Sequence, residues 1–198
     1  MPDRVPIHTQ AEHFLGAIRE DDTTAAIALL QATPALSRYS IHTAAAAGDA
    51  AAVRAFLASD PVLATQRDDR NSLEPLLYAV QQDLKVARGI APEDHLAIVR
   101  ALLDAGADPN AAAPLPDVAD AIPALFFPCV HGNVAVARLL LERGAKPTDG
   151  ESLYHAAQHD HRECLALLRS FGADLNRGPA EHGNTPLHFL VAHTPGNP

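Results

Sequence analysis

One short phrase recurs in this chain and constrains the fold more than any other feature. It reads Gly-Ala-Asp-Pro-Asn at 106–110, Gly-Ala-Lys-Pro-Thr at 144–148 and Gly-Ala-Asp-Leu-Asn at 172–176. Ahead of each copy, apolar residues are spaced three and four positions apart, which predicts a helix that ends at the glycine. Repetition of one phrase is typical of proteins that stack copies of a single small unit. We therefore expect a repeat array.

A second, shorter helical segment lies earlier in each unit, at 75–82, 124–132 and 152–160. The first part of the chain repeats the pattern in a weaker form, because 41–63 aligns with 14–36. Alanine and leucine dominate the apolar residues and only 5% of residues are aromatic, which suits short helices that pack closely. Each unit is predicted to be a helix, a tight turn, a second helix and a loop.

The ends of the units carry a specific set of residues. They are Gly183-Asn184-Thr185-Pro186-Leu187-His188, the three glycine-alanine endings, and the stretch from Ile41 to Gly48. Together they resemble the ankyrin repeat family, from about residue 10 to the end of the chain. The resemblance implies an all-α fold, an ankyrin-repeat α-solenoid of stacked helix-turn-helix pairs with short hairpin-like loops. It implies a single domain over 1–198, with repeats near 10–38, 39–70, 71–111, 121–149 and 150–178 and a partial repeat at 182–198.

The two histidines at equivalent positions of this pattern, His188 and His42, are interpreted as structural. The resemblance implies that His188 forms a local hydrogen bond that holds the turn, and His42 is given the same role. Threonine and proline suit a helix start, because one caps a free amide and the other needs none. Leucine pairs at 102–103, 140–141 and 167–168 are expected to fill the shared core.

Two insertions depart from the family pattern. Residues 83–93 stretch the third unit, and we expect them to extend its first helix before a loop at Pro92. Residues 111–122 replace a hairpin and contain no glycine, so the hairpin is not expected there. Pro128 is compatible with a helix only near its first turn. The chain stops within a sixth unit, which favours a fragment of a longer protein over a terminal cap.

Composition argues against several classes of protein. A net charge of −9 disfavours nucleic acid as a partner. No apolar run is long enough to span a membrane, and no secretory leader is visible, so we expect a cytoplasmic protein. We also expect a monomer. Alanine-rich composition with more arginine than lysine suggests a bacterial source. Cys129 and Cys164 lie in apolar runs without metal-ligand spacing, where a thiol behaves as a small hydrophobe.

The best candidate for chemistry is a cluster of His155, His159, His161 and Cys164. Two histidines four residues apart on a helix can share one ion. However, Ala156 stands where a histidine-glutamate metal motif has its glutamate, and Cys164 is expected to point away into the core. No nucleophile elbow, phosphate-binding loop or carboxylate pair is found. We therefore expect no enzyme, no cofactor and no metal.

The predicted function is binding of a partner protein with a basic or mixed-charge surface. The resemblance implies contacts from loop tips and from the ends of first helices on the concave face. The candidate residues are Arg70, Asn71, Leu73, Gln81, Gln82, Val130, His131, Gln158, His159, His182, Asn184 and His193. One alternative is a regulatory or targeting segment of a longer enzyme or secreted effector. Another is a histidine-based metal or pH sensor.

Overall fold

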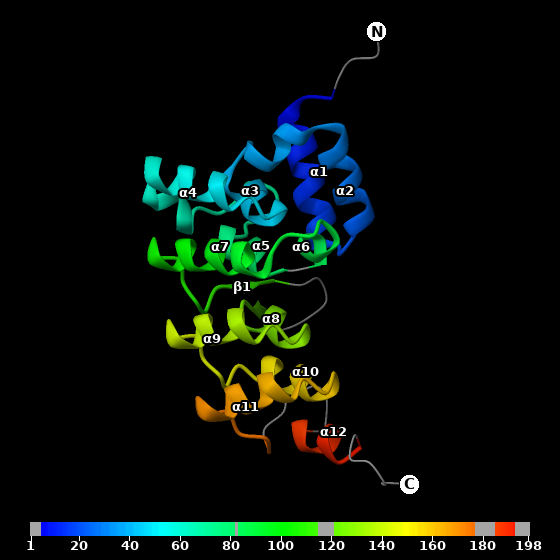
Figure 1. Ribbon diagram of the computed structural model, residues 1–198, viewed down its shortest axis with the longest axis vertical. Coiled ribbons are helices and arrows are strands. Elements are labelled where there is room, and N and C mark those ends of the chain that lie inside the picture. The colour runs from blue at the N-terminus through cyan, green and yellow to red at the C-terminus, as the bar shows by residue number, and fades with distance from the viewer. Residues whose placement is uncertain (1–4, 82, 115–120, 177–184, 193–198) are drawn as a thin grey trace. The chain divides into compact units, whose positions relative to one another are not determined.

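The chain is mostly helical and divides into two compact units, Met1–Asp108 (unit 1) and Pro109–Pro198 (unit 2). The structure is a computed structural model that describes residues 5–81, 83–114, 121–176 and 185–192 (Figure 1). Gln82, His182, Asn184 and His193, four of the predicted contact residues, lie outside the described residues. In the part of the chain that is described, no helix is long and apolar enough to cross a membrane.

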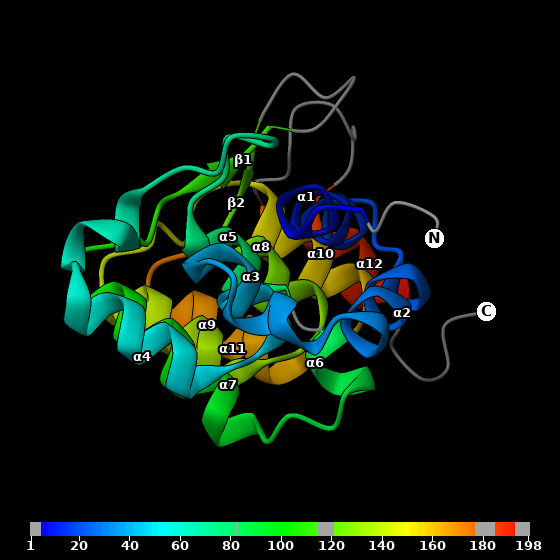
Figure 2. The same ribbon diagram turned by 90° about the horizontal axis from the view of Figure 1, so that it is seen from above.

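Unit 1 consists of helix pairs joined by short turns. Its elements are α1 (Ile7–Arg19), α2 (Thr23–Ala32), η1 (Pro34–Arg38), α3 (Ile41–Ala47), α4 (Ala50–Ser59), η2 (Pro61–Thr65), α5 (Pro75–Val80), α6 (Asp83–Ala87) and α7 (Pro92–Asp104). Helix α3 packs on α1, α4 and α5, and α4 packs on α7. Within this unit, Figure 2 shows α3 and α5 in one row and α4 and α7 in another.

Small side chains allow this close packing. All four alanines at the end of α3, residues 44–47, are 0–1% exposed. The leucine pairs expected in the core are buried in both units: Leu102, Leu103, Leu140, Leu141, Leu167 and Leu168. Each buried leucine side chain contributes about 1.5–3 kcal/mol of transfer free energy. The stacked-helix pattern predicted from the sequence is therefore present within each unit.

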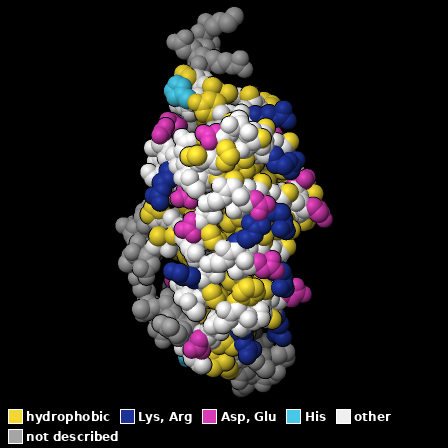
Figure 3. All heavy atoms as spheres, turned by 90° about the vertical axis from the view of Figure 1, so that its left-hand side faces the viewer, with side chains coloured by type: hydrophobic (Ala, Val, Ile, Leu, Met, Phe, Trp, Pro, Cys, Tyr) yellow, Lys and Arg dark blue, Asp and Glu magenta, His cyan; other side chains and the backbone are white. Residues whose placement is uncertain are grey.

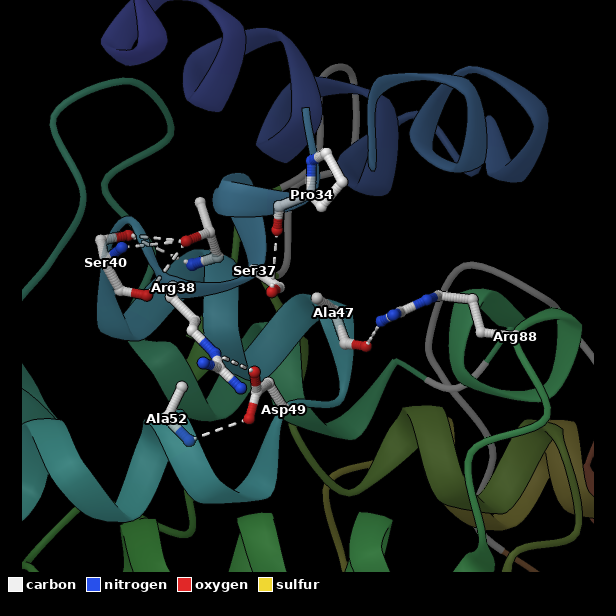
Figure 4. Close-up of polar contacts among 9 residues, drawn as sticks. Pro34, Ser37, Arg38, Ser40, Ala47, Asp49, Ala52 and Arg88 are labelled. Atoms are coloured by element: carbon white, nitrogen blue, oxygen red, sulfur yellow. Dashed lines mark hydrogen bonds and ion pairs between the residues drawn. The ribbon is translucent and has the colours of Figure 1, made fainter. Parts of the chain in front are cut away.

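Polar side chains fix the helix ends of the second repeat (Figure 4). The Ser40 hydroxyl accepts from the Thr43 amide at 3.2 Å, and the Ser40 amide donates to the Thr43 hydroxyl at 3.0 Å, forming a capping box at the start of α3. Asp49 caps α4 by accepting from the Ala52 amide at 2.9 Å, and it also pairs with Arg38 at 3.1 Å. These contacts set the turn between α3 and α4.

The insertion predicted at 83–93 does not extend the preceding helix, and we call its part before α7 the inserted segment (83–90). Instead α5 ends at Val80, a separate helix α6 packs on α2 and α3, and Pro92 begins α7 rather than a loop. The Lys85 ammonium donates to the Tyr78 and Gln81 carbonyls at 2.9 and 2.6 Å, and the Arg88 guanidinium donates to the Ala47 carbonyl (Figure 4). The expectation was wrong because the Lys85 side chain donates to carbonyls at the end of α5, where a continuous helix would place backbone amides.

Unit 2 repeats the helix-pair arrangement. Its described elements are β1 (Ala112–Ala113), β2 (Ile122–Pro123), α8 (Phe126–Val130), α9 (Val134–Glu142), α10 (Glu151–Gln158), α11 (Arg162–Ser170) and α12 (Pro186–Ala192). Helix α10 packs on α8, α11 and α12, and α9 packs on α11. The glycines that end α7, α9 and α11, Gly106, Gly144 and Gly172, have φ of +98°, +99° and +97°, which confirms the predicted left-handed helix ends.

The second insertion also departs from the prediction, because the antiparallel pairing that was not expected is present. Ala112 pairs with Pro123 and Ala113 pairs with Ile122. Glycine is required in tight two-residue hairpin turns. The two strands here are separated by eight residues, so this requirement does not apply. Nearby, the Asn110 amide group donates to the Gly144 carbonyl at 3.1 Å and its oxygen accepts from the Lys146 amide at 3.0 Å. Successive loops of unit 2 are thus hydrogen-bonded together.

Candidate functional site

A cleft of about 420 Å³ opens on unit 1 between α1, the start of α3 and the loop that follows η2. We call it the unit 1 cleft. It is lined by His8, Ala11, Glu12 and Leu15 of α1, by Tyr39, Ser40, Ile41 and His42, by Phe56 and Leu63, and by Gln66, Arg67, Asp68, Asp69 and Arg70. Its volume is in the range of pockets that bind small molecules or side chains. The last residues belong to the loop 66–73, which joins the second repeat to α5.

Loop 66–73 is held by a single carboxylate. Asp68 accepts from the amides of Arg70 at 3.0 Å, Asn71 at 2.7 Å and Leu73 at 3.0 Å, and from the Tyr78 hydroxyl at 2.9 Å. The Asn71 side-chain amide in turn donates to the Tyr78 oxygen at 2.8 Å. Burial raises the pKa of Tyr78, so the phenol keeps the proton that it donates. The loop is therefore ordered before any partner arrives.

His42 ties the same loop to α3. Its Nε2 lies 2.7 Å from the Gln66 carbonyl oxygen, and because a carbonyl can only accept, the ring nitrogen donates. The ring is 5% exposed, and burial lowers its pKa, so the imidazole is neutral near pH 7. This bond is structural, as predicted, but it reaches the next loop rather than the turn of its own repeat.

The predicted contact residues of unit 1 fall into different environments. Arg70 lines the unit 1 cleft and is exposed, whereas Asn71 and Gln81 are half-buried. The prediction that Leu73 contacts a partner was wrong. Its side chain is 1% exposed and lies in the core, where no partner can touch it. The amide of Leu73 is directed at Asp68, which turns the side chain inward. The Gln81 carbonyl accepts from Lys85, so its backbone belongs to the helix end.

The predicted residues of unit 2 that the structure describes lie at the ends of α8 and α10. Gln158 and His159 are exposed, and Val130 and His131 are half-buried. The Val130 carbonyl lies 3.0 Å from His161 Nε2, which donates to it. The His159 and His161 rings stack with their centroids 6.0 Å apart. Partial burial, together with the neighbouring imidazoles, lowers the pKa of His159.

Side chains of the cluster considered for metal binding are bonded to other groups of the protein. His155 pairs with Glu151 at 3.2 Å and with Gln158 at 2.9 Å. Cys164 is buried and hydrogen-bonds to Cys129. Within the described ranges, no three histidine, cysteine or acidic side chains are placed to hold one ion.

His188 forms the predicted local bond, since its Nδ1 accepts from the Thr185 amide at 3.0 Å.

Sequence reasoning missed most of the unit 1 cleft. His8, Glu12 and Tyr39 come from the first repeat and its junction with the second, where the family pattern is weakest. For Asp69, the position beside Arg70 at a loop tip was the sequence signal that could have identified it as a cleft residue. The fully buried Lys85 was also missed, because a lysine in an insertion is normally solvated.

Comparison with known proteins identifies the repeats. The chain is 32% identical over 160 residues to the ankyrin repeat protein nuc-2 of Neurospora crassa, in an alignment that covers 78% of this chain and 13% of that protein. The human ASB11 ankyrin repeat domain matches in structure with a TM-score of 0.60 and 26% identity, over 76% of this chain and 62% of that domain. The chain is an ankyrin repeat protein. No family model matches it.

The family assignment confirms the predicted all-α ankyrin-repeat fold. It also makes the chain a protein-interaction repeat domain in general terms. The suggestion of a bacterial source has no support, since the relative is fungal. In ankyrin repeat terms, the unit 1 cleft lies between the first helices of two repeats and the loop that joins the second repeat to the third.

Proposed function

We propose that this ankyrin repeat protein binds a partner protein through its first helices and the loops between repeats, and has no catalysis of its own. The observation that carries the proposal is the unit 1 cleft, whose wall is a loop held by four hydrogen bonds to Asp68. A loop that is already ordered loses little conformational entropy on binding. Contacts are expected from Arg70 in unit 1 and from Gln158 and His159 in unit 2, which are exposed.

The proposed partner has a basic or mixed-charge surface, because the net charge of this chain is −9. On the face shown in Figure 3, lysine and arginine side chains lie among aspartate and glutamate side chains. That face therefore offers no continuous basic surface among the described residues, and nucleic acid is a poor fit to it. We further propose that the chain acts as a monomer in the cytoplasm.

A second candidate function rests on the length of the relative. The aligned region is only 13% of that protein, so ankyrin repeats of this kind also occur within much longer chains. The module could then serve to target or regulate an attached enzyme or effector. Both candidates share the same binding step and the same surface.

The binding step is tested by selecting a displayed library of proteome fragments on the purified chain. Carboxylates are then labelled with a carbodiimide in the free and bound protein. We expect Asp69 to be protected by a selected fragment, while the exposed Glu20 at the end of α1 is labelled equally in both states. Absence of any enriched fragment, or protection restricted to the carboxylates of α7, Glu93, Asp94 and Asp104, would contradict the proposal.

A further inference from the structure

The floor of the unit 1 cleft is apolar. Ala11, Leu15 and Ile41 form its buried part, and Phe56 and Leu63 are half-buried. Tyr39 stands at its side with 42% of its surface exposed, which is large for an aromatic residue. An exposed ring beside an apolar floor is suited to binding an aliphatic side chain, because both surfaces lose contact with water when the side chain binds.

The charges around this floor are unevenly compensated. Arg67 lines the cleft and lies 3.8 Å from Glu74, which does not, so these two charges offset each other. Asp68 accepts four hydrogen bonds from its own loop and from Tyr78. Its lone pairs are therefore committed to the loop rather than to a ligand.

Arg70 is also held in place. A Cβ atom on Gly16 would lie 3.2 Å from Arg70 Nε and 3.3 Å from one of its terminal nitrogens, so the guanidinium lies flat against α1. The Arg70 backbone amide donates to Asp68, which brings the two opposite charges into one loop. The side chain thus bridges the loop and α1 and closes one side of the cleft.

Two exposed carboxylates are left at the edge of the cleft, Glu12 on α1 and Asp69 at the loop tip. They come from segments far apart in the sequence that line the same cleft. An opposite charge placed beside them gains attraction that partial desolvation strengthens. The cleft therefore combines an apolar pocket with an anionic rim.

We infer that the unit 1 cleft binds an extended peptide segment in which a lysine or arginine stands next to an aliphatic residue. The aliphatic side chain enters between Tyr39, Phe56 and Leu63, and the basic side chain lies along Glu12 and Asp69. This inference rests on the proposed function and specifies the partner's chemistry at one site. It requires no rearrangement of loop 66–73, because the loop is already fixed.

The test uses an array of immobilised hexapeptides that vary at two central positions, with leucine or serine at one and lysine, glutamine or glutamate at the other. The full chain is the soluble probe. We expect retention to be strongest for peptides with leucine and lysine, and to weaken as salt is added. Glu12→Lys is expected to weaken binding of the best peptide at least about fivefold, since attraction is replaced by repulsion.

Glu20→Lys is the matched control, because it makes the same charge change at the residue that follows α1, outside the cleft. Circular dichroism checks that both variants fold, and Asp69→Asn gives a second, milder variant on the other wall. Glutamate peptides that bind as well as lysine peptides would overturn the inference. Equal losses in Glu12→Lys and Glu20→Lys would also overturn it. So would sedimentation that shows a dimer in the wild type and a monomer in Glu12→Lys, since a second copy of the chain would then occupy the cleft.

The outcome separates the inference from the proposed function. If displayed proteome fragments are captured but the hexapeptides show no preference for lysine, the protein-binding function stands and the inference about the cleft fails. If no fragment and no peptide is captured, both fail.

Discussion

Loop 66–73 and the inserted segment (83–90) each have a charged side chain that bonds to several groups, but the two charges are opposite. In the loop, the Asp68 carboxylate accepts from three backbone amides and a phenol. In the inserted segment, the Lys85 side chain donates to two backbone carbonyls. The sign of each charge follows from the backbone group that lacks a partner, since a tight turn leaves amides free and a helix end leaves carbonyls free.

The two charged groups also differ in burial. Asp68 is half-buried beside the unit 1 cleft, whereas Lys85 is 2% exposed. Burial lowers the pKa of Lys85 to about 7, with nearby Asp83 opposing this effect. Because burial lowers the pKa of Lys85, we expect the stability of the inserted segment to depend on pH. The difference predicts a ranked set of effects.

The largest effect is expected from Lys85→Met measured across alkaline pH. The unfolded chain keeps a proton on Lys85 up to its ordinary pKa of 10.5, while the folded chain releases it near pH 7. Between these values the unfolded state binds more protons, so the free energy of unfolding rises with pH, by up to about 1.4 kcal/mol per unit. Urea unfolding at pH 7.5 and 9.5 should show this rise in the wild type and not in Lys85→Met.

Methionine keeps the apolar stem of the lysine, so the comparison isolates the amine. Stability curves that run parallel for the two proteins would show that Lys85 is protonated throughout. The two carbonyls would then stabilise its charge more than burial opposes it.

A second prediction concerns His95, which lies in the same buried environment. Its Nε2 donates to the Ala79 carbonyl at 2.8 Å, and burial, followed by the nearby Lys85 charge, lowers its pKa to about 4. Between pH 6.5 and 4 the unfolded state binds more protons, so acid should destabilise the fold by up to about 3 kcal/mol through this group. In His95→Gln, which keeps a donor, unfolding curves from pH 7 to 4.5 should lose part of this acid sensitivity.

The third prediction tests the loop side of the comparison. Asp68→Ala removes the acceptor for the buried Leu73 amide and the Tyr78 hydroxyl, and we expect a loss of about 2 kcal/mol. Asp68→Asn keeps one oxygen and should cost about half as much, and Tyr78→Phe about 1 kcal/mol. Chemical denaturation measures all three. Near-equal stability of Asp68→Ala and the wild type would mean that the loop is held by its packing instead.

Much of the fold could be predicted because its signals are local. The glycines at 106, 144 and 172 mark helix ends by backbone conformation alone, and no heavy atom lies within 4 Å of a Cβ built on any of them. His188 bonds to Thr185, three residues away. The leucine pairs follow helical spacing, which a sequence displays directly.

The inserted segment and the cleft could not be predicted in this way. The contacts of Lys85 depend on where α5 ends, and the walls of the cleft join α1 to a loop more than fifty positions later, at 66–70. Leu73 was misplaced because the loop was treated as a solvated tip. An aspartate followed by a leucine within one turn was the overlooked sign that the loop folds back onto the core.

The smallest expected effect is that of Arg88, which provides the second contact of the inserted segment. Its guanidinium donates to the Ala47 carbonyl at the end of α3 (Figure 4), but unlike Lys85 the residue is exposed. Water can replace an exposed donor, so Arg88→Gln should lower the free energy of unfolding by less than about 1 kcal/mol. Its stability should keep most of the wild-type pH dependence, since the buried amine is intact and the Arg88 charge lowers the pKa of Lys85 less than burial does. A loss equal to that of Lys85→Met at the same pH would mean that the segment is held at its exposed end, and that burial is not what distinguishes it from loop 66–73.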